Sequence, residues 1–259
     1  MTRKPPNINA LEPNRTPKLL LAIALLMMAT MCAVAQEDPL ITNEYRFTQL
    51  VTRPINDKVV LFTYSGYTRS PEKAFHSVYA SPPNLVFIPK SWVEIYAALI
   101  VVYTDNKTGG DSWEFRPITG VRFYLPNTKK LNIFSWTRYE NRFILQNRNM
   151  ISIPRLRNRF GIEAPLAQGD KKWAPKSFYM LADVEPIWRL DEKRLQVFRA
   201  RGGLGYIFNR AFRAEFQYFG EFSKTESQPS EHTGNIWRLN LKIFLDRHGL
   251  RFPKDVDID

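Results

Sequence analysis

Arginine and carboxylate residues recur at alternate positions through the C-terminal half of this 259-residue sequence. A guanidinium group is planar, keeps its charge and donates hydrogen bonds in a fork that matches a carboxylate or another oxyanion. Residues two apart share one face of a β-strand, so this spacing predicts a network of ion pairs on one strand face. The candidate network comprises Arg138, Glu140, Arg142, Arg155, Arg157, Arg159, Glu163, Asp183, Glu185, Arg199, Arg201, Arg213, Glu215 and Arg238.

The charges of this set do not balance. Its nine arginines minus its five carboxylates leave four positive charges without a partner in the set. One interpretation is a barrel interior that is filled by side chains and held together by ion pairs. The other is a narrow passage that favours anions, or a binding site for a small anionic solute.

Catalytic chemistry has weaker support. A nucleophile needs an adjacent base, and the candidate pairs are His76 with Ser77 and His232 with Ser230, besides a third histidine, His248. Neither pair comes with a third orienting group at a recognisable spacing, so no catalytic residue is assigned. The candidate carboxylates each have an arginine on the same strand face, which favours ion pairs over a glycosidase-like acid and base.

Neither a metal nor a cofactor is expected. Three scattered histidines and a single cysteine, Cys32, supply no cluster of metal ligands. The segment 105–111 is rich in Asp, Asn and Gly, but it lacks the alternating oxygen ligands and the terminal Glu of a calcium-binding loop. We interpret this segment as the loop of a β-hairpin.

The elements that position these residues are predicted to be β-strands, because apolar residues alternate with polar ones at a period of two. The clearest segment places Trp237, Leu239, Leu241 and Ile243 opposite Arg238, Asn240 and Lys242. Similar segments lie at 138–143, 155–163, 178–185, 198–208 and 212–218, the last two joined by the tight link Asn209-Arg210.

The N-terminal half is less regular but still strand-like. We expect strands at Glu44–Thr52, Lys58–Arg69, Trp92–Tyr103 and Trp113–Leu125. Trp92–Tyr103 is apolar enough for a buried helix, but its β-branched and aromatic residues favour a strand. The nearest thing to a linker is Pro71–Pro83, and no domain boundary is visible. The total is about ten strands, with eight to twelve possible, in one all-β domain.

Residues 1–35 have the layout of a secretory signal peptide. Basic residues precede an apolar run from Leu19 to Met31, and Ala33-Val34-Ala35 forms a small-x-small cleavage site. The run is shorter than the roughly 20 apolar residues that a membrane-spanning helix needs. We therefore expect cleavage after export, which leaves residues 36–259 as the mature domain.

The composition narrows the partners. The chain has 37 Lys and Arg against 25 Asp and Glu, a net charge of +12. The leader holds four basic residues and one acidic residue, so the mature balance is 33 minus 24, or +9. Cys32 lies in the leader, which excludes a disulfide framework, and an exported chain is not expected to bind nucleic acid.

The polar face separates a membrane barrel from a soluble β-sandwich. Arginine and carboxylates dominate it, while the opposite face is rich in Phe, Tyr, Trp and Leu, a pattern typical of transmembrane barrels with lipid outside and charge inside. Tryptophans occur near segment ends or in loops, where interfacial girdles place them. The six are Trp92, Trp113, Trp136, Trp173, Trp188 and Trp237. We predict a single up-and-down antiparallel transmembrane β-barrel in the bacterial outer membrane, with outer-membrane lipid as its partner.

Four segments carry a resemblance to a known family. The sequences from Trp136 to Phe143, Arg155 to Leu166, Phe178 to Trp188 and Arg199 to Arg210 resemble the outer-membrane barrel family known as domain of unknown function 2490. The resemblance covers about half of the mature chain. It implies a small outer-membrane barrel and supplies no activity. The connection Ala164–Lys176 is longer than a periplasmic turn should be.

Three functional hypotheses follow. The first is an integral outer-membrane barrel of unknown specific role, either structural or a narrow anion-favouring passage. The second is a barrel-embedded enzyme that modifies lipid. The third is a soluble periplasmic barrel that binds a ligand.

Overall fold

The computed structural model describes residues 41–107, 110–125, 131–166, 173–223 and 231–245. These residues form twelve strands and no helix, which confirms the all-β class. The strands are β1 (Thr42–Pro54), β2 (Val59–Ser70), β3 (Phe75–Ala80), β4 (Asn84–Lys90), β5 (Val93–Asn106), β6 (Ser112–Leu125), β7 (Asn132–Gln146), β8 (Asn149–Pro165), β9 (Ser177–Arg189), β10 (Arg194–Ile207), β11 (Phe212–Ser223) and β12 (Glu231–Phe244). The predicted leader and its cleavage site lie outside the described residues.

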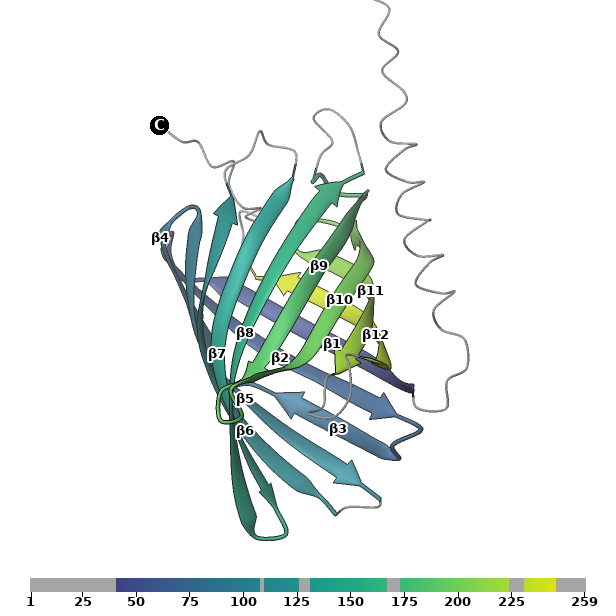
Figure 1. Ribbon diagram of the computed structural model, residues 1–259. Coiled ribbons are helices and arrows are strands. Elements are labelled where there is room, and N and C mark those ends of the chain that lie inside the picture. Colours follow the sequence, from purple (N-terminus) through teal and green to yellow (C-terminus); the bar gives the residue numbers. More distant parts are fainter. Residues whose placement is uncertain (1–40, 108–109, 126–130, 167–172, 224–230, 246–259) are drawn as a thin grey trace, which may run out of the picture. The chain divides into compact units, whose positions relative to one another are not determined.

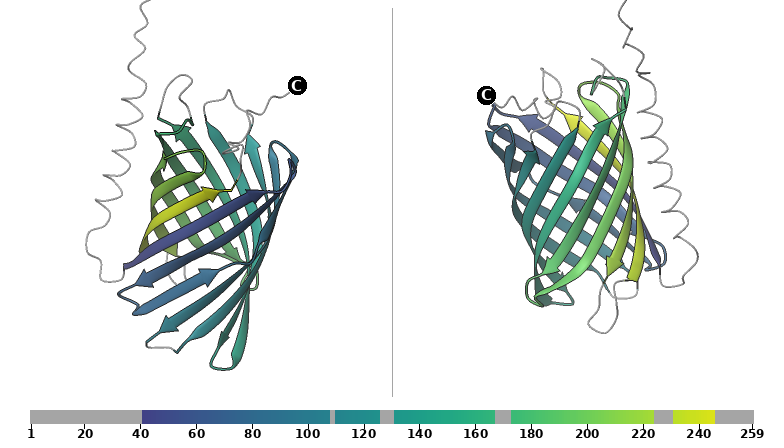
Figure 2. Two further views of the ribbon diagram at one scale, coloured as in Figure 1. Left: turned by 180° about the vertical axis from the view of Figure 1, so that it is seen from behind. Right: turned by 45° about the horizontal axis from the view of Figure 1, so that its top comes forward.

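The strands close into one barrel (Figures 1 and 2). Two of them, β3 and β4, share one position in the wall, because both lie between β2 and β5. The barrel therefore has eleven positions, near the predicted ten. The segment Trp92–Tyr103 is confirmed as a strand, since β5 contains nearly all of it.

The closing pair is the one departure from a fully antiparallel barrel. β1 and β12 run parallel, in register from Thr42 opposite Gly234 to Thr52 opposite Phe244. When an odd number of neighbouring positions alternate in direction, the first and the last run the same way, so eleven positions require a parallel seam. As a result β1 starts at one rim of the barrel, and β12 ends at the other.

The break between β3 and β4 explains why the sequence pattern missed both strands. Pro82 and Pro83 lack the backbone N–H that a ladder needs. The Ser81 hydroxyl takes over as a partner, accepting hydrogen bonds from the Tyr64 backbone N–H at 2.7 Å and from Asn84 Nδ2 at 2.8 Å. The segment Pro71–Pro83, expected to be the nearest thing to a linker, thus contains β3 and becomes part of the wall.

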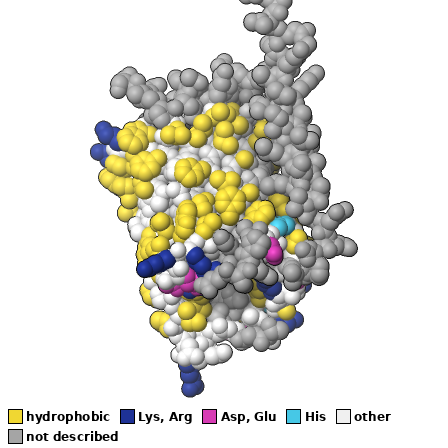
Figure 3. All heavy atoms as spheres, in the orientation of Figure 1, with side chains coloured by type: hydrophobic (Ala, Val, Ile, Leu, Met, Phe, Trp, Pro, Cys, Tyr) yellow, Lys and Arg dark blue, Asp and Glu magenta, His cyan; other side chains and the backbone are white. Residues whose placement is uncertain are grey.

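Along the strands, polar side chains alternate with hydrophobic ones, but here many of the polar side chains are buried and many of the hydrophobic ones are exposed. In β9 the buried side chains include Asp183 and Glu185, whereas Phe178 and Val184 are exposed. Across the described residues, 15 polar or charged residues are buried against 11 hydrophobic ones, and 27 large hydrophobic residues are exposed. In Figure 3 the hydrophobic side chains gather over the strands, and charged side chains lie toward the upper edge and the lower part. The barrel wall therefore has an apolar exposed face and a polar buried face.

A small apolar core lies on the buried face. Tyr179, Leu181 and Ile207 pack together, and Trp173 packs against them. The Tyr179 ring occupies the space beside Gly205, its register partner on β10, where an added Cβ would lie only 2.2 Å from a ring carbon. The absence of a side chain at Gly205 therefore lets Tyr179 reach its position.

We expect Gly205→Ala to lower the free energy of unfolding by about 1–3 kcal/mol, because the new methyl group displaces the Tyr179 ring from a packed site. Urea unfolding followed by tryptophan fluorescence measures this change. Gly202→Ala is the matched control on the same strand, since an added Cβ there meets nothing within 4 Å. Equal stability of the two variants would contradict the packing role of Gly205.

Candidate functional site: a buried network of ion pairs

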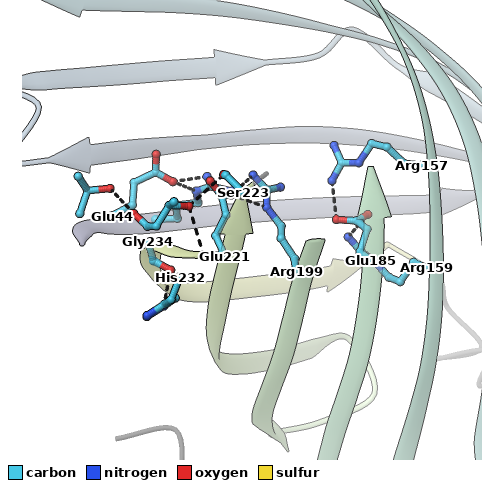
Figure 4. Close-up of polar contacts among 12 residues, drawn as sticks. Glu44, Arg157, Arg159, Glu185, Arg199, Glu221, Ser223, His232 and Gly234 are labelled. Atoms are coloured by element: carbon cyan, nitrogen blue, oxygen red, sulfur yellow. Dashed lines mark hydrogen bonds and ion pairs between the residues drawn. The ribbon is translucent and has the colours of Figure 1, made fainter. Parts of the chain in front are cut away.

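Glu185 on β9 is the centre of a network of ion pairs on the buried face. Its carboxylate accepts hydrogen bonds from Arg157 Nη2 at 2.6 Å, Arg159 Nη2 at 3.1 Å and Arg138 Nη2 at 3.3 Å. In Figure 4 the side chains of Arg157 and Arg159 point toward Glu185. Three guanidinium groups from β7 and β8 thus converge on one carboxylate of β9.

The network extends to both sides of Glu185. Arg157 Nη1 also donates to both oxygens of Glu140 on β7, each at 3.2 Å. Arg159 Nε lies 3.7 Å from Asp183 Oδ1, and Arg201 Nε donates to Asp183 Oδ2 at 2.5 Å. Ion pairs therefore connect four consecutive strands, from β7 to β10.

A second carboxylate, Glu215 on β11, is almost fully enclosed, with 1% of its side chain exposed. It accepts hydrogen bonds from the Tyr179 hydroxyl at 2.5 Å, from Gln217 Nε2 at 2.6 Å and from Asn240 Nδ2 at 2.8 Å. It also forms an ion pair with Lys242 on β12. Glu215 thus links β9, β11 and β12.

Further ion pairs lie closer to the rims. On β6 and β7, Arg142 holds Glu114 by two parallel hydrogen bonds of 2.7 and 2.6 Å, and Arg116 Nε donates to the same carboxylate at 2.6 Å. On β10 and β11, Arg199 Nε donates to Glu221 at 2.7 Å, a contact visible in Figure 4.

Exposure divides this network into a dry middle and wetter ends. The side chains of Glu140, Glu185 and Arg157 are 1%, 3% and 8% exposed, whereas those of Arg142 and Glu221 are 22% and 23% exposed. Ion pairs out of contact with water are held by their mutual geometry, because each charge depends on its partner. The charged side chains of the middle layer therefore bind one another and have little contact with water.

Aromatic side chains enclose one cation of the network. The Arg122 guanidinium lies 4.4 Å from the Trp136 ring centroid and 5.0 Å from that of Tyr96, distances typical of cation–π contacts. Trp136 also packs against Arg138 and Arg159. The expectation that Trp136 belongs to an interfacial girdle is therefore wrong: its position on β7 shares the face of Arg138, two residues away. Trp92 and Trp113 are exposed, and Trp173 packs against the apolar core.

The remaining predicted residues take separate places. Glu163 accepts a hydrogen bond from Asn132 at 3.3 Å. Arg213 lies over the rings of Tyr179 and Phe244, and Arg238 lies over Phe219. The buried Nε of Arg155 has no hydrogen-bond partner among the described residues.

The sequence pattern missed several members of the network. They are Glu44, Arg46, Glu94, Glu114, Arg116, Arg122, Glu221 and Lys242. A usable signal was present, because Glu44 and Arg46, like Glu114 and Arg116, stand two residues apart. The irregular apolar alternation of the N-terminal half concealed it.

Of the three histidines, the structure describes His76 and His232, and neither of these contacts a serine hydroxyl among the described residues. His76 and Ser77 are neighbours on β3, so their side chains lie on opposite faces of the strand. His76 Nε2 lies 3.3 Å from Asp105 Oδ2, while Ser77 shares a hydrogen bond with Thr104. His232 Nε2 lies 3.1 Å from the Gly234 carbonyl oxygen. Ser230 and His248 lie outside the described residues.

Two turn carboxylates are held outside this network. Arg189 donates hydrogen bonds to Asp191 in the β9–β10 turn and lowers the pKa of that carboxyl. The Asn43 amide donates to Glu72 in the β2–β3 turn and lowers its pKa in the same way. The described segments hold no group of three or more His, Cys, Asp or Glu placed to bind a metal ion. Nor do the described segments include a helix long and apolar enough to cross a membrane.

Comparison with known proteins returns a family without a known activity. No curated protein matches the chain. The family model described as "Protein of unknown function (DUF2490)" matches residues 42–232, which is 191 of 259 residues. The match confirms the resemblance and extends it through the N-terminal strands β1 to β6. The chain therefore belongs to the DUF2490 family of proteins of unknown function.

Proposed function

We propose that this protein is an integral outer-membrane β-barrel whose polar interior is closed near its middle, with a structural rather than an open-pore role. The observation that carries the proposal is the inverted polarity of the wall. Exposed Phe, Leu and Val side chains on neighbouring strands would order water in solution, whereas a lipid environment accommodates them. On the other face, buried Glu side chains accept charge-assisted hydrogen bonds from buried Arg side chains.

The strand lengths support the same environment. A transmembrane strand tilted by about 45° needs about 9–11 residues. Outside the β3–β4 position, the strands have 12 to 17 residues, so each is long enough to cross a bilayer. Closure of the sheet also pairs the backbone groups of the first and last strands, which lipid could not satisfy.

Membrane fractionation of cells that express the full chain tests this proposal. We expect the protein in the outer-membrane fraction, resistant to carbonate washing, and we expect faster gel migration without heating than after boiling. Recovery in the detergent-free soluble fraction would instead support a soluble periplasmic barrel. A changed lipid profile in a deletion strain, restored by the wild-type chain but not by a His76→Ala variant, would support a lipid-modifying enzyme.

A second candidate function, a narrow anion-favouring passage, is favoured by one observation: the interior arginines outnumber the interior carboxylates. The ion-paired layer around Glu140, Arg157 and Glu185 opposes it, because these side chains are at most 8% exposed and already have charged partners, so they are poorly placed to line an open passage. Planar-bilayer recordings of the refolded protein separate the two. We expect no steady conductance. A stable anion-selective current would contradict the structural role and support a role in anion transport.

A further inference from the structure

One arginine of the buried face stands in a cationic neighbourhood without a hydrogen-bonded carboxylate. Arg155 on β8 lies opposite Glu140 on β7 in the register of the two strands. Arg142 is two residues from Glu140 on β7, so it is a diagonal neighbour of Arg155, and Arg116 lies on the next strand, β6. We call Arg116, Arg142 and Arg155 the arginine triad.

The carboxylates near the triad are already engaged. Glu114 binds Arg116 through Oε1 and binds Arg142 through both of its oxygens. Both oxygens of Glu140 accept hydrogen bonds from Arg157. No hydrogen bond joins Arg155 to Glu114 or Glu140, and the buried Nε of Arg155 has no hydrogen-bond partner in the described part of the chain.

The local charge is positive. Arg155 lies among Arg142, Arg157 and Arg116, and Glu140 is the carboxylate opposite it in the strand register. Arg157 is shared with Glu185, so the four arginines stand against three carboxylates, Glu114, Glu140 and Glu185, and the local excess is one positive charge. A guanidinium held among other cations with a buried, unsatisfied donor is unfavourable unless an acceptor reaches it.

The triad can be reached by a small ligand. The side chains of Arg116 and Arg142 are each 22% exposed, whereas the Glu114 carboxylate between them is 8% exposed. The two arginine side chains of the group are thus more accessible than the carboxylate that they bind. Convergent guanidinium donors recognise oxyanions through charge-assisted, bidentate hydrogen bonds.

We propose that the arginine triad binds a small tetrahedral oxyanion of the phosphate type inside the barrel. The anion supplies acceptors for Arg155 and offsets the local excess of positive charge. This inference needs only the barrel fold and goes beyond the proposed membrane role, since it concerns a bound ligand.

Inorganic phosphate is the probe that tests it. The thermal unfolding midpoint of the full-length wild-type protein should rise with phosphate beyond its rise in sodium chloride of the same ionic strength, because a ligand that binds only the folded state stabilises it. Calorimetric titration gives the affinity. An equal rise of the midpoint in chloride and in phosphate would overturn the proposed site, because ionic screening alone would then explain the stabilisation.

Variants locate the site. Arg155→Gln should weaken phosphate binding about tenfold or more, since it removes charge-assisted hydrogen bonds, and Arg155→Lys should weaken it less. The matched control is Arg238→Gln on β12, another interior arginine whose Nε has no hydrogen-bond partner among the described residues; it should bind like the wild type. Equal losses in the Gln variants of Arg155 and Arg238 would assign binding to the overall interior charge and overturn the triad. Heat-modifiable migration of each variant reports barrel formation independently of phosphate.

Discussion

Replacing Glu185 with glutamine should lower the free energy of unfolding by about 3–5 kcal/mol, the range found when one partner of a buried ion pair is removed. The Glu185 side chain is 3% exposed, and its carboxylate forms ion pairs with three arginines, Arg138, Arg157 and Arg159. Glutamine keeps the shape and one acceptor oxygen but removes the charge, so three guanidinium groups lose the carboxylate on which they converge. Urea unfolding of the refolded protein, followed by tryptophan fluorescence, measures the change.

Glu192→Gln provides the matched control. Glu192 also forms ion pairs with two arginines, Arg189 and Arg194, but in the exposed β9–β10 turn. Exposed pairs contribute about 0–1 kcal/mol, so this variant should remain close to the wild type. If both glutamine variants lowered the free energy of unfolding by the same small amount, the buried ion pairs around Glu185 would not be a main source of the barrel's stability.

Replacing Phe216 with arginine should destabilise the barrel in lipid vesicles by about 2–4 kcal/mol, the effect of a cationic side chain near the bilayer midplane. Phe216 is 55% exposed near the middle of β11, and its register partners Leu204 and Leu239 are exposed as well. In a soluble barrel the same substitution would expose a charge to water and would change stability by only about 0.5 kcal/mol.

Ile55→Arg controls for the substitution itself. Ile55 is 53% exposed, nearly as much as Phe216, but it lies in the turn between β1 and β2. A cation near the interface has an effect of about 0–1 kcal/mol. Equilibrium folding into vesicles compares the two variants, and similar small effects in both would argue against lipid contact at Phe216.

Much of the fold follows from the alternation of residues. The segment Trp237 to Leu245 has strand periodicity and contains the whole second half of β12. Asn209-Arg210 forms the expected tight turn, where Asn209 Oδ1 accepts a hydrogen bond from the Ala211 backbone N–H. Strand count and seam direction could not be read in this way. They depend on β3 and β4, which are short and separated by two prolines, and a pattern of period two is too weak over six or seven residues.

The candidate network was predictable as residue types on one face, but its pairings were not. Glu140 and Arg138 are close in sequence, yet Arg138 binds Glu185, 47 residues away. Such partners depend on the register between strands. A shift of two residues keeps every side chain on the same face, so hydrophobic alternation alone does not distinguish registers that differ by two. Trp136 shows the same limit. It stands two residues from Arg138 on β7, but that spacing places its ring inside the barrel only once the face that carries Arg138 is known to point inward.

The most direct test of the central claim, that the exposed face of the wall contacts lipid, is a pair of single-cysteine variants. The chain's only native cysteine, Cys32, lies in the predicted leader, so a Cys32→Ser background leaves no competing thiol. Phe216→Cys and Gln217→Cys place nitroxide labels at neighbouring positions of β11 that are 55% and 1% exposed. In reconstituted bilayers, we expect the label at 216 to collide with oxygen, which partitions into lipid, and to be shielded from a water-soluble nickel chelate, whereas the label at 217 should be shielded from lipid. A label at 216 that collides freely with the nickel chelate would contradict the membrane barrel.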